Sequence, residues 1–541
     1  METRREHNLE RLASGRLFDL LIIGGGATGC GTALDAASRG LDVALVDSQD
    51  FAAGTSGRST KLIHGGVRYL EAAVKQIDPG QYNLVRDGLR ERWRLLRNAP
   101  HLCWTIPLIT PLYRWHEIPY ITSGLKLYDL LAGRRSLGHS QLLSRAETLR
   151  RLPALNSDGL KAGVLYYDGQ FNDARLAVSL AVTAARHGAT VANHLAVTGL
   201  LHDGGDVAGA ELRDRLTGAR MTVQARGVVN ATGPFVDEIR AMDDPHAARL
   251  LTLSAGMHLV LDRRFAPPGA GLMIPKTDDG RILFVLPWGG HALVGTTDVP
   301  AELGEHPQPT AEQIDYLLRH LGRYLKQPVG KQEIKATWAG LRPLLSAGGA
   351  ASTAKLSRDH LIETSRNRLL TITGGKWTTY RKMAEETVDR AIKLFALAPD
   401  KPACQTKDLP IVGSDGYAPD GDRRLATRHG LDDEVARHLH CSYGDRAEQV
   451  VTFADDDTPA ARLVPGHPLI EAEVRYVVRH EFAVTALDVL ARRLSLAVLD
   501  TEAARQAADR VIAIMAEELG WDAERRTAET DDVAERLTNA L

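Results

Sequence analysis

The sequence predicts an α/β protein in which a Rossmann-like dinucleotide-binding domain precedes a separate all-α domain. Three observations predict this fold: a glycine-rich βαβ unit near the N-terminus, strand-like and helical stretches that alternate through the following part, and helical periodicity from about residue 408 onward. A chain of 541 residues is too long for one hydrophobic core, so two or three domains are expected.

The βαβ unit lies within the first fifty residues. An apolar run ends in Gly24, Gly26 and Gly29, a helical stretch follows, and a second apolar run ends at Asp47. The first glycine permits a tight turn, the second lets the backbone approach a pyrophosphate, and the third lets the helix pack close to the strand. Free N–H groups at the start of the helix favour phosphate, and the later carboxylate should bind ribose hydroxyls. We therefore predict a dinucleotide site here.

Later strand-like segments extend this core. Apolar runs at 228–231 and 369–373 alternate with a helical stretch at 173–187, which is typical of an α/β core. The β-rich segments at 257–261, 281–286 and 292–296 instead indicate a second, antiparallel sheet that covers the cofactor.

The pattern changes in the last quarter of the chain. Apolar residues recur at helical spacing in four stretches, at 431–440, 471–478, 486–494 and 501–519. We expect a separate helical domain at 405–541, which is an ordinary domain size.

Composition excludes several classes of protein. A formal net charge of −2 argues against a nucleic-acid binder. The cysteines are scattered and lack a CxxC pair, so we expect reduced thiols and no metal site. No apolar run approaches the roughly twenty residues that span a bilayer, and residues 1–16 resemble neither a signal nor a transit peptide.

Two downstream motifs favour FAD over NAD, which the glycine fingerprint alone does not distinguish. Residues 229–234 and 373–379 each end a strand in a small-residue turn where the backbone can approach a dinucleotide. Amide dipoles and Lys376 at the second turn would stabilise the negative charge that reduced flavin carries near N1 and O2.

Several segments resemble the signature of the FAD-dependent glycerol-3-phosphate dehydrogenases. They are residues 59–71, 167–175, 295–298, 338–344 and 374–381, while residues 486–493 resemble the C-terminal helical domain of the mitochondrial-type branch. Two departures stand out: Asp47 replaces the longer Glu expected there, and the calcium loop of the animal enzymes is missing.

This resemblance implies a D-amino-acid-oxidase-like arrangement. An FAD-binding domain at 17–400 would be interleaved with an antiparallel-sheet substrate cap at about 80–157 and 240–345. It also implies oxidation of sn-glycerol 3-phosphate to dihydroxyacetone phosphate by hydride transfer to flavin N5. The electrons would pass to quinone, from a peripheral position on the inner face of the cytoplasmic membrane. A homodimer and a supporting role for the helical domain both stay open.

The resemblance also assigns candidate residues. The phosphate dianion needs forked cationic donors, for which Arg68, Arg342 and Arg358 are candidates, although a surface ion pair is the ordinary fate of an arginine. Tyr69 and Lys376 complete the substrate set. His258 is the candidate base, although a mid-strand histidine is by default a core side chain, and Arg342 would also stabilise the forming oxygen. The candidate FAD-binding residues are Gly24, Gly25, Gly26, Thr28, Gly29, Asp47, Thr55, Ser56, Ser59, Lys61, Leu62, His64, Gly65, Thr232, Gly233, Gly375, Lys376, Trp377 and Thr378.

Other functions compete with this one. An oxidase would use the same substrate-side residues and reduce O2 to H2O2. An amino-acid oxidase on the same scaffold needs only one arginine clamp, and a non-catalytic, FAD-stabilised binding protein belongs to a different class. Aromatic residues in 104–131 suit either a membrane contact or the core of the cap.

Overall fold

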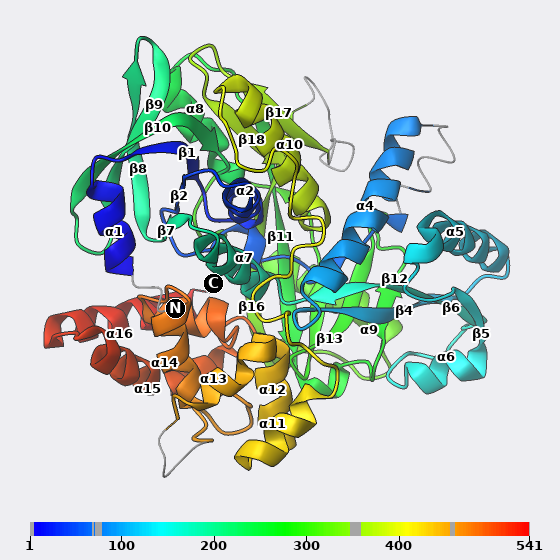
Figure 1. Ribbon diagram of the computed structural model, residues 1–541. Helices are drawn as coiled ribbons and strands as arrows, with labels where there is room; N and C mark the ends of the chain where they lie inside the picture. The colour runs from blue at the N-terminus through cyan, green and yellow to red at the C-terminus, as the bar shows by residue number, and fades with distance from the viewer. Residues whose placement is uncertain (1–4, 68–69, 71–77, 347–358, 455–459, 540–541) are drawn as a thin grey trace.

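The computed structural model describes residues 5–67, 70, 78–346, 359–454 and 460–539 (Figure 1). Two large sheets and a C-terminal group of helices make up this part of the chain. The first sheet has the strand order β17-β18-β10-β1-β2-β7, with β8 and β9 added beside β10. Its strands are β1 (Leu17–Ile23), β2 (Val43–Val46), β7 (Thr190–Ala192), β8 (Leu195–Asp203), β9 (Asp206–Asp214), β10 (Arg220–Asn230), β17 (His360–Thr364) and β18 (Leu370–Gly374).

The centre of this sheet is parallel, as expected for a dinucleotide-binding domain. β7, β2, β1, β10 and β18 run parallel to one another, while β17 is antiparallel to β18. The helices α2 (Ala27–Ser38), α7 (Asp173–Arg186) and α10 (Tyr380–Leu394) pack against one another and bury a shared core with the sheet. Helix α1 (Arg5–Ala13) contacts β7 and β10, and α8 (Val236–Asp243) follows β10.

The second sheet forms the cap. Its order is β15-β11-β14-β13-β12-β4-β6-β3, with β16 paired to β11 and β5 paired to β6. The strands are β3 (Leu62–Ile63), β4 (Cys103–Leu112), β5 (Gln141–Ser144), β6 (Ala162–Phe171), β11 (Leu251–Leu261), β12 (Gly271–Ile274), β13 (Leu283–Trp288), β14 (His291–Gly295), β15 (Val299–Pro300) and β16 (Ile334–Leu345). The helices α4 (Pro79–Asn98), α5 (Glu117–Ala132), α6 (Arg145–Arg151) and α9 (Ala311–Tyr324) lie in the same part of the chain.

The cap sheet differs from expectation in three details. All its pairs are antiparallel except β4 and β12, which run parallel. It takes in β3 and β6, which lie outside the expected cap ranges. The strand expected at 281–286 lies at 283–288, because Arg281 pairs with Asp279 and bonds back to Thr277 in a turn.

The C-terminal part is helical, as the periodicity predicts. Its helices are α11 (Gly421–His429), α12 (Asp433–Tyr443), α13 (Ala447–Val451), α14 (Glu471–His480), α15 (Thr501–Leu519) and α16 (Ala523–Thr538). The stretch expected as a helix at 486–494 forms a π-helical turn, Asp488–Arg493. Gly520 ends α15 with a left-handed φ of 67°, which favours glycine.

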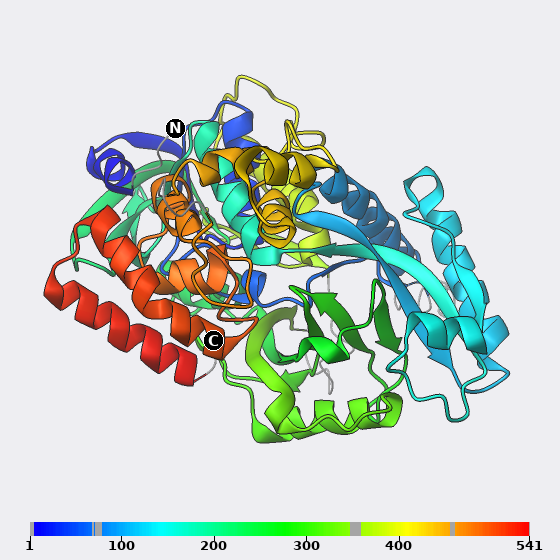
Figure 2. The same cartoon turned by 90° about the horizontal axis from the view of Figure 1, so that it is seen from below.

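Buried ion pairs fasten this helical domain to α7, which packs with the first sheet. Glu481, which follows α14, accepts hydrogen bonds from Arg175 of α7 and from Arg446. All three side chains are nearly inaccessible to solvent, and the two arginines lower the pKa of Glu481 despite its burial. Figure 2 shows the last two helices, α15 and α16 (red), at the opposite end of the molecule from α5 (cyan).

Candidate active site

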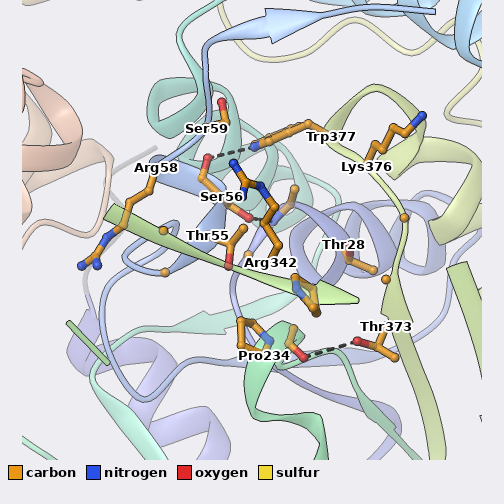
Figure 3. Close-up of a pocket in the computed structure, with 18 of the residues that line it drawn as sticks. Thr28, Thr55, Ser56, Arg58, Ser59, Pro234, Arg342, Thr373, Lys376 and Trp377 are labelled. Atoms are coloured by element: carbon orange, nitrogen blue, oxygen red, sulfur yellow. Dashed lines mark hydrogen bonds between the residues drawn. The ribbon is translucent and has the colours of Figure 1, made fainter. Parts of the chain in front are cut away.

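A cavity of about 1670 Å³ lies between the two sheets. One wall consists of the glycine turn after β1, the residues after β2 and the ends of β10 and β18. The other wall consists of residues from β11, β13 and β16 of the cap. Figure 3 shows side chains from both walls around this space.

The glycine turn allows little room for side chains. A Cβ on Gly29 would lie 1.7 Å from the carbonyl oxygen of Gly24, so only glycine lets α2 pack this close to β1. Gly24 has a φ of 108°, which L side chains rarely adopt. The N-cap residue of α2 is Gly26, which has no side chain to cap the helix. The N–H of Ala27 donates to the Ser56 hydroxyl at 2.9 Å. The N-terminus of α2 therefore suits a phosphate.

Asp47 lines the cavity but already holds two backbone groups. Its carboxylate accepts hydrogen bonds from the N–H of Gly25 at 2.5 Å and of Gln49 at 2.7 Å. Burial raises the pKa of Asp47 to about 6, although these two N–H groups oppose that shift. A ribose hydroxyl at this position would compete with, or share, an acceptor that shapes the turn.

The two downstream motifs come to the same wall. The indole N–H of Trp377 donates to the Ser56 carbonyl at 2.8 Å, and the N–H of His64 donates to Thr378 Oγ1 at 3.2 Å. Thr373 Oγ1 donates to the carbonyl of Gly233 at 3.3 Å. Segments more than 300 residues apart thus form one continuous surface.

The cap wall carries the two candidate catalytic side chains. In the pairing of β11 with β16, Ser254 is opposite Arg342 and His258 is opposite Trp338, so both candidates project from the same face of the sheet. Two glycines make room for them: a Cβ on Gly256 would lie 2.0 Å from the Arg342 guanidinium, and one on Gly295 would lie 2.1 Å from the His258 ring.

His258 is a neutral, buried imidazole. It is 2% exposed and stacks on Trp338 with 4.1 Å between ring centroids, and Thr60 Oγ1 lies 2.9 Å from Nε2. Burial, followed by the positive charges of Arg342 and Lys61, holds the pKa of His258 well below its usual value. The ring is therefore available to take a proton at neutral pH.

Arg342 is held in place by its neighbours. Nη2 donates to Thr296 Oγ1 and to the carbonyl of Thr297, both at 3.0 Å, and Nη1 lies 3.2 Å from Asp298 Oδ1. About a fifth of the side chain, 21%, stays exposed at the cavity. The guanidinium is thus fixed in orientation while part of it still faces the space where an anion can bind.

The structure brings most of the candidate residues together on the cavity wall. Those that line it are Gly24, Gly26, Thr28, Asp47, Thr55, Ser56, Ser59, Leu62, His64, Thr232, Gly233, His258, Arg342, Gly375, Lys376, Trp377 and Thr378. Arg68, Tyr69 and Arg358 lie outside the described residues.

Four candidates do not line the cavity. Lys61 is buried and its ammonium pairs with Asp173 at 2.5 Å and donates to the Gly57 carbonyl, so its role is structural. Gly25 and Gly29 shape the turn from behind, and the N–H of Gly65 donates to the Tyr128 hydroxyl at 2.7 Å.

Sequence reasoning missed other residues of the cavity wall. Thr60 and Asp298, which contact the candidate base and the candidate arginine, lie inside the segments that carry the resemblance. Both lie in loops, and only the folded chain shows that they contact His258 and Arg342. Arg58 also lines the cavity, and its guanidinium points away from Arg342 and Lys376 in Figure 3.

Comparison with known proteins agrees with this architecture. A family model of FAD dependent oxidoreductases matches residues 19–381, and one of the C-terminal domain of alpha-glycerophosphate oxidase matches residues 404–526. The chain is 44% identical to a probable mitochondrial glycerol-3-phosphate dehydrogenase of Caenorhabditis elegans, over 97% of this chain and 74% of the relative. It is 45% identical to a mitochondrial glycerol-3-phosphate dehydrogenase of Arabidopsis thaliana, over 96% of this chain and 86% of the relative. The crystal structure of the Bacillus halodurans glycerol-3-phosphate dehydrogenase with FAD superposes with a TM-score of 0.81 at 30% identity, covering 99% of this chain and 97% of that one.

Proposed function

The chain belongs to the family of FAD-dependent glycerol-3-phosphate dehydrogenases, and on that premise we propose that it oxidises sn-glycerol 3-phosphate to dihydroxyacetone phosphate and delivers the electrons to a membrane quinone. One observation supports this proposal most directly. A neutral histidine, His258, and a fixed arginine, Arg342, project from the same face of the cap sheet, opposite the wall that contains the glycine turn.

The residues of the cavity fit FAD. The start of α2 and the glycines before it would hold the pyrophosphate, and the turns after β10 and β18 would hold the rest of the dinucleotide. The chemistry that bound FAD supplies is acceptance of the hydride from substrate C2.

The chain's own residues handle charge and the proton. Arg342 binds the phosphate or the oxygen at C2, with its orientation set by Asp298 and Thr296. His258 takes the hydroxyl proton, and we assign Nε2 to this step because Nδ1 is buried beneath the surface. A bound dianion would offset the charge of Arg342 and so raise the basicity of His258 as substrate arrives. Lys376, at the start of the turn after β18, contributes a second cation to the cavity.

Exposed aromatic and aliphatic side chains on the cap support a peripheral membrane contact. Trp115 is 70% exposed, Tyr120 51% and Leu130 75%, all on or beside α5. Rings of this kind beside basic residues suit the headgroup region of a bilayer. No helix of the described chain is long and apolar enough to cross a membrane. The proposed location is therefore the inner face of the cytoplasmic membrane, where quinone is available.

Anaerobic reduction tests the reaction itself. Adding sn-glycerol 3-phosphate to the oxidised flavoprotein should bleach the flavin absorbance, whereas glycerol at the same concentration should not. Flavin that stays oxidised at every concentration of sn-glycerol 3-phosphate contradicts the proposal. With substrate present, a quinone analogue should reoxidise the flavin faster than O2 does; the opposite order would favour the oxidase.

Replacing Arg342 tests how the dianion is held. Arg342→Ala should lower the rate of bleaching at limiting substrate about 100-fold, because charged hydrogen bonds of this kind contribute roughly 1.5–3 kcal/mol. Arg342→Lys keeps the charge beside Asp298 and serves as the matched control. Both variants should retain flavin. Near wild-type efficiency in the alanine variant would remove Arg342 from the substrate site.

A further inference from the structure

Two groups of hydrogen bonds and ion pairs join the C-terminal helical domain to the rim of the cofactor cavity. The first holds the loop that follows β2, which carries Asp47. Asp50, three residues later and fully buried, accepts hydrogen bonds from Arg493 at 3.0 Å and from Arg492 at 2.5 Å. Both arginines belong to the π-helical turn of the C-terminal domain. The carboxylate of Asp50 therefore depends on that domain for its positive partners.

The same region contains a group of acids with a histidine. Asp50, His194 and Asp488 are close enough to hold a metal ion. However, Arg492 also bonds Asp488 at 2.7 Å, so the arginines already neutralise both carboxylates. The ring of His194 lies 3.1 Å from Asp488, and the backbone N–H of His194 donates to the Gln49 carbonyl. These side chains therefore link the C-terminal domain to the loop that carries Asp47.

The second group of contacts holds an adjacent segment of the rim. Residues 303–305 line the cavity, and His306 follows them directly. The imidazole of His306 contacts Arg58 at 3.3 Å on Nδ1 and Arg536 of α16 on Nε2. Burial, then the charges of Arg536 and Arg58, lowers the pKa of His306 to about 4, so the ring is neutral and can accept a hydrogen bond.

Arg215 connects the two groups of contacts. Its guanidinium pairs with Glu305 at 2.9 Å and donates to the carbonyl of Ser48 at 3.4 Å. Arg215 itself lines the cavity. The contacts therefore form a continuous series along this part of the rim, from Arg493 through Asp50, Ser48, Arg215, Glu305 and His306 to Arg536.

We propose that the C-terminal domain completes the cofactor site, and that Arg493 and Arg536 are positioning residues that hold this rim closed over bound FAD. Neither residue lines the cavity. They act through Asp50 and His306, on loops that do line it or adjoin it. The inference concerns retention of the cofactor and applies whichever substrate the enzyme oxidises.

The experiment measures FAD affinity without substrate. FAD is removed, and the dissociation constant on rebinding is determined from quenching of flavin fluorescence. Arg536→Ala should weaken FAD binding about tenfold, mainly through faster release, which corresponds to the loss of about one hydrogen bond. Arg536→Lys, which can still donate to His306, should recover most of the affinity. Arg510→Ala removes a surface pair with Glu471 in the same domain and should leave affinity unchanged.

A double-mutant cycle separates positioning from general stability. If Arg536 acts through His306, the variant that combines Arg536→Ala with His306→Ala should bind FAD no more weakly than His306→Ala alone. The melting temperature of the FAD-free protein should change little in these variants. Wild-type affinity in Arg536→Ala, or effects that add in the double variant, would overturn the proposal.

Arg493 needs a gentler change, because alanine would leave Asp50 buried without its main partner. Arg493→Lys keeps a positive charge there and should weaken FAD binding less than Arg536→Ala does. Because no substrate is present, a failure here is distinguishable from a failure of the proposed reaction, which the bleaching experiment reports on its own.

Discussion

One wall of the cavity presents mainly backbone amides and small side chains to a ligand, whereas the wall opposite presents the candidate base and the candidate substrate-binding guanidinium. The FAD-sheet wall uses the glycine turn, the amides at the start of α2 and small hydroxyl residues. The cap wall uses His258 and Arg342, with glycines of the neighbouring strands leaving room for both. The first wall fixes where a dinucleotide lies, and the second decides what reacts with it. Substitutions should therefore have different consequences on the two walls.

The largest effect is expected where the backbone wall has no space. In Gly29→Val the first side-chain carbon would lie 1.7 Å from the Gly24 carbonyl, so α2 would be forced away from β1. We expect no flavin in the purified protein, and overpacking of this severity also costs a few kcal/mol of stability. The measurement is the ratio of FAD absorbance to protein.

Gly54→Ala is the matched control for this variant. Gly54 lines the same cavity, and a Cβ there meets nothing within 4 Å. It should retain FAD. A fully flavinated Gly29→Val protein would mean that the close approach of helix and strand is not required.

A substitution on the cap wall should leave FAD binding unchanged and slow flavin reduction. His258→Asn keeps a polar group of similar size but removes the proton acceptor, so flavin reduction should slow by roughly 10²–10⁴-fold. FAD content and substrate-independent spectra should stay the same. Stopped-flow bleaching by sn-glycerol 3-phosphate measures the rate.

The contact with Thr60 offers a milder control. Thr60→Val removes the hydroxyl 2.9 Å from His258 Nε2 but leaves the ring in place. Its effect should be smaller than that of His258→Asn. If the two variants were equally slow, His258 would act by holding Thr60 and not as the base.

The contrast between the walls also explains how much the sequence could predict. The sequence could place Gly24, Gly26 and Asp47 at this cavity wall because backbone-built sites need fixed residue types at fixed spacing. Side chains that act on substrate follow no such spacing, so His258 and Arg342 rested on resemblance to a family. The polar partners of these two residues, Thr60, Thr296, Thr297 and Asp298, lie in loops that only the folded chain brings beside them, which no local pattern encodes.

Lys61 shows where local reasoning assigns the wrong neighbour. Its place in a motif beside the cofactor loop indicated a contact with FAD, yet the side chain turns inward to Asp173 of α7. Burying an ammonium requires a carboxylate partner, and Asp173 at the start of that helix provides one. The choice depends on how α7 packs, which the motif does not contain.

The smallest expected effect concerns His360, a histidine near the first wall that is protonated at neutral pH, whereas His258 is neutral. His360, at the start of β17, lies 2.6 Å from Glu386 and 3.2 Å from Asp359, and Lys382 pairs with the same Glu386. Although burial opposes it, these carboxylates raise the pKa of His360 from 6.5 to about 9. The folded protein therefore binds this proton more tightly than the unfolded chain does. The stabilisation is complete below about pH 6.5 and is lost as the pH rises through about 9.

His360→Gln should reveal this window as a pH-dependent gap. At pH 6 the FAD-saturated variant should be less stable than the wild type by about 2 kcal/mol, a value reduced for the solvent exposure of both carboxylates. By pH 9.5 the gap should close, because the wild type has then lost the same proton. Urea unfolding at several pH values measures it. His258→Asn should show the opposite trend, because the buried His258 ring stays neutral when folded while the unfolded chain binds a proton below about pH 6.5, so the wild type loses stability at pH 6 relative to the variant. A gap that stayed constant from pH 6 to 9.5 would mean that His360 is not charged in the folded protein, and the two histidines beside the cavity would then not differ in charge.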